Sequence, residues 1–290
     1  MIVFGSMKMI SALTAVSVAL LVGYGTARQP FAAAAVFVRK LFLSPRHLIL
    51  FLSLLLIMAL NKFELSLEAA LPVPPDLTRI LVGWEGSWQG TLQRALESPW
   101  LTHFCAFFYL VVFQGFMVAS LIFYASAGKD KQYYALCVAL LLNYLIAVPF
   151  YLFVPVHEAW DASSNIRFLM LDVFPTFETQ YRHLSGLDNC FPSLHTSISV
   201  TMALVALRSG SKRWAMFGIA NAVIIIFSIF YLGIHWATDM FAGVILATLA
   251  VAIGLKAGAW VDRSQVRRGR QPRLHKDELK QLAPSRLTDS

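Results

Sequence analysis

The chain has 290 residues, of which 58% are hydrophobic and 14% are charged, and its mean hydropathy is +0.64. Because average soluble domains carry about 25% charged residues, this composition excludes an ordinary soluble protein and indicates a polytopic membrane protein. The formal net charge of +8 does not indicate nucleic-acid binding, since most basic residues lie in short loops between apolar runs and in the C-terminal tail. We therefore expect membrane lipids and no nucleic acid as partners.

Apolar runs along the chain predict an all-α membrane protein with about seven transmembrane helices. The predicted spans are residues 2–24, 47–61, 99–127, 133–156, 192–208, 213–235 and 237–260. The first run has some features of a signal peptide, but its cleavage would leave the basic residues of the following loop outside. We divide the chain into an N-terminal helix with a cytoplasmic linker (1–46), a helical membrane domain that carries the motifs below (47–260), and a basic cytoplasmic tail (261–290).

The distribution of basic residues predicts the orientation of the helices. Of the 24 Lys and Arg residues, 18 fall at the loops after the first, third and fifth runs and in the C-terminal end from Lys256 onward. The positive-inside rule therefore places the C-terminus in the cytoplasm and the N-terminus outside. The short chain and the lack of a targeting address favour a bacterial inner membrane.

Two longer segments lie on the predicted outer side. The loop 62–98 contains three prolines, followed by amphipathic stretches at 77–82 and 88–96, which we expect to lie flat in the membrane interface. A lid over a site is the alternative interpretation. The loop 157–191 carries several charged and histidine side chains. The polar tail from Asp262 onward is expected to contact anionic lipid headgroups.

Two short motifs at the predicted outer face carry candidate chemistry. Pro-Ser-Leu-His at 192–195 begins one apolar run, and His-Trp-Ala-Thr-Asp at 235–239 separates the last two runs. His235 and Asp239 are four residues apart, so on a helix their side chains share a face. A carboxylate there keeps one imidazole nitrogen protonated and leaves the other free to attack. Pro192 suits a helix start, whose unpaired amides bind anions such as phosphate.

Two imidazoles, a carboxylate and an anion-binding helix start together predict a phosphoryl-transfer site at the extracytoplasmic face. An intramembrane serine protease that uses Ser193 with His235 is one alternative, although the serine lacks flanking glycines. A transporter that relays protons through buried His and Asp is another. Its binding site should lie near the membrane midplane, whereas these residues cluster at one face.

The two motifs resemble the last two signature motifs of the type 2 phosphatidic acid phosphatase superfamily. Those motifs read Pro-Ser-Gly-His, and Ser-Arg, five residues, His, three residues, Asp, and the match covers roughly residues 99–260, the six-helix core of the family. The resemblance implies that His235 is the nucleophile, that Asp239 orients it, and that His195 protonates the leaving alkoxide and then activates the acceptor. Ser193 and the helix-start amides would hold phosphate oxygens. The family chemistry requires no metal and no cofactor.

The sequence departs from the family pattern where basic residues are expected. Ile229 stands in place of the family Arg, Leu194 replaces a Gly, and the Lys, six residues, Arg-Pro pattern is missing from the end of the 133–156 run. That run ends instead with Tyr151, followed by Pro155 and Trp160. This arrangement resembles the branch that contains inositol phosphorylceramide synthases and their bacterial relatives.

The missing cations favour one class of substrate. A phosphodiester carries about one negative charge and a phosphomonoester about two, so fewer fixed cations suffice for the diester. The predicted function is transfer of a phospho-head group from a phospholipid to a lipid alcohol through a phosphohistidine. Hydrolysis of phosphatidic acid, a related phosphomonoester lipid or polyprenyl pyrophosphate is the alternative. Candidate substrate-binding residues are Ser193, Arg182, His183 and Tyr151; solvated loop positions are the alternative interpretation of Arg182 and His183.

Overall fold

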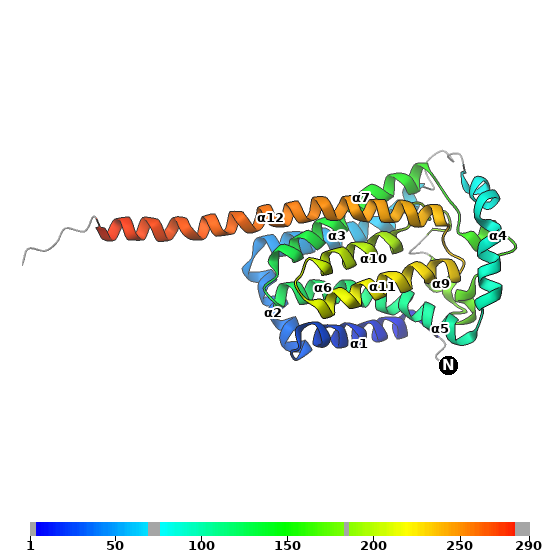
Figure 1. The fold of residues 1–290 in the computed structure, drawn as a ribbon, viewed down its shortest axis with the longest axis horizontal. Helices are drawn as coiled ribbons and strands as arrows, with labels where there is room; N and C mark the ends of the chain where they lie inside the picture. Colours follow the sequence, from blue (N-terminus) through cyan, green and yellow to red (C-terminus); the bar gives the residue numbers. More distant parts are fainter. Residues whose placement is uncertain (1–3, 69–75, 183–185, 282–290) are drawn as a thin grey trace, which may run out of the picture.

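Long apolar helices run side by side in the computed structural model, which describes residues 4–68, 76–182 and 186–281 (Figure 1). The elements are α1 (Met7–Thr26), α2 (Pro30–Leu43), α3 (Pro45–Glu68), α4 (Thr78–Leu96), α5 (Pro99–Phe107), the π-helical segment η1 (Phe108–Val112), α6 (Phe113–Ser126), α7 (Asp130–Phe153), α8 (Ala159–Ala162), the 3₁₀ turn η2 (Leu169–Asp172), α9 (Phe177–Gln180), α10 (Leu194–Leu207), α11 (Lys212–Tyr231) and α12 (Ala237–Gln281).

The predicted all-α membrane fold is confirmed, and each of the seven predicted runs falls on a helix. Within the described residues, five segments are long and apolar enough to cross a membrane: α1, Pro99–Ser126, α7, α11 and Ala237–Val261 of α12. Residues 30–60 form a pair of helices bent by 104°, which would make a sixth span if it crosses as one. The apolar helix α10 has only 14 residues and is therefore about 21 Å long.

Three segments differ from their prediction. Residues 30–43, which the sequence placed in a linker, form α2, because Pro30 opens the helix and the Gln29 side chain accepts a hydrogen bond from the Ala32 amide. One continuous helix, α4, replaces the two short amphipathic stretches. Helix α12 continues to Gln281, beyond its predicted end at residue 260.

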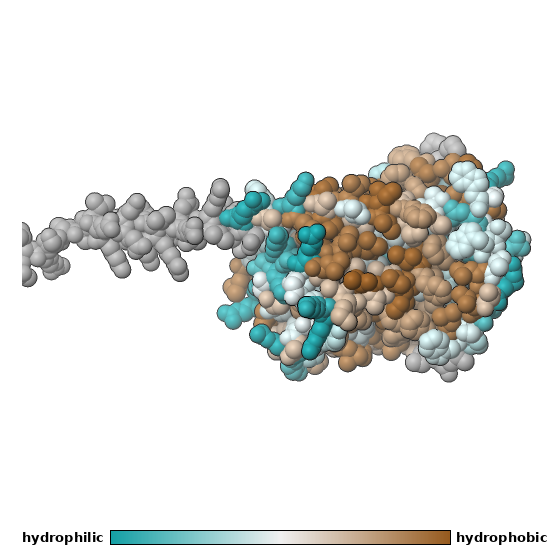
Figure 2. Space-filling model, in the orientation of Figure 1, coloured by the Kyte–Doolittle hydropathy of each residue, from teal (hydrophilic) through white to brown (hydrophobic). Residues whose placement is uncertain are grey.

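The surface has an apolar band between two hydrophilic ends, as Figure 2 shows. Large apolar side chains are exposed on several helices, such as Leu20 on α1, Val223 on α11 and Ile245 on α12. Exposed apolar surface of this extent on a monomer indicates contact with lipid. Helix α4 lies across one end of the bundle, and the polar extension of α12 leaves the other end (Figure 1).

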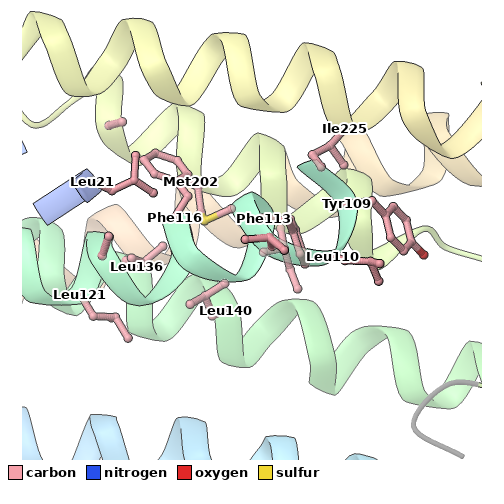
Figure 3. Packing of buried hydrophobic residues seen from close by; sticks show 14 of the residues in the cluster. Leu21, Tyr109, Leu110, Phe113, Phe116, Leu121, Leu136, Leu140, Met202 and Ile225 are labelled. Atoms are coloured by element: carbon pink, nitrogen blue, oxygen red, sulfur yellow. The ribbon is translucent and has the colours of Figure 1, made fainter. Parts of the chain in front are cut away.

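The core of the bundle is formed by apolar side chains from α6, α7, α10 and α11. Phe116, Leu136, Met202 and Ile225 belong to this core, and each is at most 1% exposed (Figure 3). Helix α10 packs in this core against α6, α7 and α11.

Two glycines allow α12 to pack directly against α7. A Cβ atom at Gly254 would lie 2.5 Å from the carbonyl oxygen of Ala135, and one at Gly258 would lie 2.4 Å from that of Lys131. Small residues four apart permit such close approach of helices in membranes. The contact fixes α12 and therefore the segment that precedes it.

Candidate active site

The first turn of α10 forms one half of the candidate site. Ser193 is the N-cap of the helix, and its buried Oγ accepts a hydrogen bond of 3.2 Å from the amide of Thr196. The amides of Leu194 and His195 have no acceptor among the described residues. This helix start therefore offers two unused N–H donors beside an imidazole.

Aromatic residues from η1 and α6 hold the ring of His195. Tyr109 stacks on this ring with a centroid separation of 4.1 Å, and its hydroxyl lies 3.3 Å from Nδ1. Phe113 packs on the ring at 4.9 Å. With Nδ1 engaged by the hydroxyl, Nε2 is the nitrogen available for proton transfer. Tyr109 was not predicted from the sequence; it lies in a π-helical segment of a kind that often occurs at functional sites.

The other half of the site is the short connection between α11 and α12. His235 precedes α12, so the prediction that it shares a helix face with Asp239 is wrong in its geometry. The two side chains still meet, because Asp239 lies in the first turn of α12 and its Oδ2 is 3.4 Å from Nδ1 of His235. The same oxygen accepts a hydrogen bond of 2.9 Å from the Trp236 amide. Both residues of the pair are buried.

The two histidines face each other at one end of the bundle. Their ring centroids are 6.1 Å apart and the ring planes make an angle of 56°. Neither Nε2 has a protein partner within the described chain. A group whose reacting atom lies about 3 Å from one nitrogen and whose leaving oxygen lies about 3 Å from the other fits this separation.

Helix α4 contributes a buried carboxylate to the start of α12. Glu85 accepts hydrogen bonds from the amides of Ala237 and Thr238 and from the Thr238 hydroxyl. Because a carboxylate satisfies the orphan donors and the positive end of a helix, this contact stabilises the α12 start. Glu85 was not among the predicted site residues.

Two glutamines on the same face of α4 hold the backbone around His235. The Nε2 of Gln89 donates to the carbonyl oxygens of Phe230 (3.0 Å) and His235 (3.2 Å). The Nε2 of Gln93 donates to those of Tyr231 (2.9 Å) and Arg167 (2.8 Å). The spacing of Glu85, Gln89 and Gln93 by four is visible in the sequence, but none of the three was predicted to contact the site.

Gly233 is required where this connection turns. Its φ is +84°, and a Cβ atom there would lie 2.4 Å from the carbonyl oxygen of Arg167. Amides of the 157–191 loop also bind the connection, since Ala159 donates to Ile234 (3.0 Å) and Trp160 donates to Gly233 (2.9 Å). The backbone beside His235 is therefore fixed from two directions.

The predicted substrate-binding residues of the outer segment have other partners in the structure. The guanidinium of Arg182 donates to both oxygens of Glu158 (2.8 and 3.0 Å) and to Glu178 (2.9 Å). Burial alone would lower the pKa of Arg182, but hydrogen bonds to these two carboxylates raise it above its usual value. Arg182 is thus positively charged, and two carboxylates balance its charge. A role in phosphate binding stays a prediction.

Tyr151 and His183 complete the list of predicted contacts. The hydroxyl of Tyr151 donates a hydrogen bond of 3.1 Å to the carbonyl oxygen of Pro192, so this tyrosine supports the first motif. His183 lies outside the described residues. Direct contact of either side chain with substrate stays a prediction.

One cluster in the site has the composition of a metal site. Cys190, His235 and Asp239 offer ligand atoms that all lie within 4.8 Å of one another. Burial raises the pKa of the Cys190 thiol well above its usual value, and nearby carboxylates raise it further. A protonated thiol is a weak ligand, because the thiolate is the form that binds metals. The sequence-based expectation of metal-independent chemistry stays a prediction.

The family of the chain follows from comparison with known proteins. The family model described as PAP2 superfamily matches residues 78–253, which is more than half of the chain and includes α4 and both motifs. No curated protein and no solved structure shows significant similarity to the chain. The two motifs, the helical membrane bundle and the match over 78–253 agree, and the chain belongs to the PAP2 superfamily, the type 2 phosphatidic acid phosphatases.

Proposed function

We propose that the protein is a membrane lipid phosphotransferase that moves a phospho-head group from a phospholipid to a lipid alcohol. Membership of the PAP2 superfamily supports a lipid phosphatase or phosphotransferase. The observation that favours transfer from a diester is the small number of free positive charges at the site. Within the described chain, no lysine or arginine bonds to His195, His235 or Asp239, and Arg182 is neutralised by two carboxylates.

In the first half-reaction, Nε2 of His235 attacks phosphorus. The new P–N bond forms as the P–O bond to the diacylglycerol oxygen breaks, and His195 donates a proton from Nε2 to that oxygen. Asp239 holds the proton on Nδ1 of His235, so the opposite nitrogen carries the attacking lone pair. The phosphate oxygens lie at the amides of Leu194 and His195, where a helix start favours negative charge.

The second half-reaction regenerates the histidine. His195, whose Nε2 now carries no proton, takes the proton of the acceptor hydroxyl. The acceptor oxygen attacks phosphorus as the P–N bond breaks. The acceptor is then esterified and both histidines return to their starting state. Tyr109 and Phe113 pack against the His195 ring. This apolar side of the site suits a lipid alcohol better than water.

We also infer that the site lies at the extracytoplasmic face of the membrane. Basic residues of the loops gather at the opposite end of the bundle, where Lys129 donates to the Ser209 carbonyl oxygen and Tyr24 bonds to the Arg213 carbonyl oxygen. An excess of Lys and Arg in short loops marks the cytoplasmic side.

The decisive experiment separates transfer from hydrolysis. Purified protein receives a phosphodiester lipid with a labelled head group together with a lipid alcohol, and in a parallel reaction phosphatidic acid. We expect labelled alcohol product, little inorganic phosphate and an acid-labile label on His235. Inorganic phosphate as the main product would establish the phosphatase alternative.

Variants test the two histidines in both reactions. His235→Gln and His195→Gln should each abolish turnover, while His157→Gln, in a partly exposed ion pair with Asp161, should not. Activity that survives both His235→Gln and His195→Gln contradicts the mechanism. A chelator should leave the rate unchanged; a loss that zinc restores would assign a metal to the Cys190 cluster.

A further inference from the structure

A cavity of about 350 Å³ lies at the end of the bundle opposite to the two histidines. It is bounded by the C-terminal ends of α1 and α6 and by the starts of α2 and α11. Helix α10 runs from one end to the other. His195 lies in its first turn, and Ser209, whose carbonyl oxygen bonds to Lys129, comes just after its last turn. A length of 14 residues corresponds to about 21 Å, so the cavity is no part of the candidate active site.

The lining of this cavity is positively charged. Arg28 and Lys129 both line it, and within the described chain no carboxylate forms an ion pair with either. Lys129 donates to the carbonyl oxygen of Ser209 (2.7 Å), which positions the ammonium group without neutralising it. Asp130 follows Lys129 in the chain, but its carboxylate pairs with Lys40 instead.

Two helix starts and two helix ends also border the cavity. Ala32 and Ala33 in the first turn of α2 and Ser211, the N-cap of α11, all line the cavity. The helices that end there have part of their last carbonyl groups occupied, because Ala27 donates to Gly23 and Lys129 donates to Tyr124. The side chains of Gln29 and Ser211 already accept one amide at each of these starts. The two cations, which no carboxylate neutralises, therefore carry the argument, and they favour an anion with oxygen acceptors.

We propose that this cavity binds the phosphate of an anionic phospholipid headgroup. The choice of a lipid over free phosphate rests on α2, whose exposed face carries Phe31 (74% exposed) and Phe42 (80% exposed). Val36 of the same helix lines the cavity and is itself exposed. Acyl chains can therefore lie on α2 while the headgroup enters the cavity. The proposal does not depend on the reaction proposed above.

The test measures which lipids the purified full-length protein retains. The protein is taken from vesicles with equal amounts of phosphatidylglycerol and phosphatidylcholine, and bound lipids are counted by native mass spectrometry. The wild type should retain phosphatidylglycerol preferentially. The double variant Arg28→Gln/Lys129→Gln should lose that preference, by about fivefold for each cation removed.

A matched variant separates a specific site from general surface charge. Lys256→Gln/Arg263→Gln removes the same charge from exposed positions of α12 that do not line the cavity. It should retain the wild-type preference. An equal loss in this control, or a wild type without preference, overturns the proposal.

Two further arms make the result independent of folding defects. Arg28→Lys/Lys129→Arg keeps the charges and should keep the preference, whereas Ala32→Trp keeps the charges but fills the cavity and should lose it. Wild-type preference in Ala32→Trp overturns the proposal.

Thermal unfolding is also measured with inorganic phosphate alone. Stabilisation equal to that by phosphatidylglycerol would assign the cavity to free phosphate and overturn the lipid assignment.

Discussion

The two helix starts that meet at the candidate site have opposite electrostatic arrangements. At α10, Ser193 caps its own helix and leaves the amides of Leu194 and His195 without an acceptor. At α12, Glu85 from a distant helix occupies the amides of Ala237 and Thr238. A helix start that already holds a carboxylate disfavours a second anion, whereas an open one attracts it. In the proposed mechanism, phosphate therefore binds on the α10 side and is attacked from the α12 side.

The largest expected effect comes from the carboxylate behind the attacking histidine. Asp239→Asn keeps the shape of the α12 start but no longer stabilises the proton on Nδ1 of His235. Loss of the equivalent carboxylate in a catalytic triad costs about 10⁴-fold in rate, so we expect a fall in kcat of about 10³- to 10⁴-fold, measured with labelled lipid in detergent.

The chain contains a matched control for this change. His157 and Asp161 are also four residues apart and bond at 2.9 Å, but both side chains are more than 30% exposed. Asp161→Asn should change kcat by less than about twofold, because an exposed pair of this kind contributes little. Equal effects of the two substitutions would show that the buried pair has no special role.

The next largest effect concerns the carboxylate that closes the α12 start. Glu85→Ala leaves two amides and a hydroxyl without their acceptor, and we expect a loss of about 2–3 kcal/mol in the free energy of unfolding. Displacement of His235 should also lower kcat about 10- to 100-fold. Glu85→Gln retains one carbonyl acceptor and should be intermediate.

The control for Glu85 lies just beyond the same helix. Glu97 forms a surface ion pair with Arg167, and surface pairs contribute about 0–1 kcal/mol. Glu97→Gln should therefore lower the thermal unfolding temperature less than Glu85→Gln does. The reverse order would mean that α4 does not position the His235 segment.

A smaller effect is expected at the open helix start. Ser193→Ala removes the N-cap of α10 and should cost about 1 kcal/mol in stability. If the amides beside it hold phosphate, the loosened turn should also raise KM for the donor lipid about threefold. Ser98→Ala removes the equivalent cap of α5, where Ser98 accepts from the Leu101 amide (3.2 Å), and should cost similar stability with KM unchanged.

Thiol labelling tests which end of the bundle faces outward without changing activity. Cys105, Cys137 and Cys190 are buried, and burial raises the pKa of the Cys190 thiol well above its usual value, which favours the unreactive protonated form. The native protein should therefore not react with a membrane-impermeant maleimide, and higher pH should not increase the reaction. Ser87→Cys on the exposed face of α4 should be labelled in intact cells, and Lys212→Cys only after permeabilisation. The reverse pattern would invert the proposed orientation.

The sequence predicted the parts of the fold that depend on local composition. Long apolar runs predicted the membrane helices because a spanning segment must be apolar over its whole length. The sequence-based prediction failed for α2, whose basic residues Arg39 and Lys40 were assigned to a linker, and for α4, which was predicted as two short interfacial stretches. Both segments have mixed composition, and only their neighbours decide which face is buried.

The site, like the fold, was predictable only where it depends on local sequence. The proximity of His195 and His235 followed from two spans that place both residues at the same end, and the structure brings the rings within 6.1 Å between centroids. Arg182 was a candidate phosphate contact because its charge was visible in the sequence. Its pairing with Glu158 and Glu178 depends on the packing of the outer loop, and no spacing in the chain indicates it.

The sequence by itself determined that this chain is a helical membrane protein with two histidines and one aspartate in family motifs, because hydropathy and motif spacing are properties of short segments. The tertiary structure alone decided that Glu85, Gln89 and Gln93 bind the connection that carries His235, and that Tyr109 holds His195. These contacts join segments far apart in the chain. A buried amide or carboxylate must find a partner wherever packing brings one, so its partner is a property of the folded molecule.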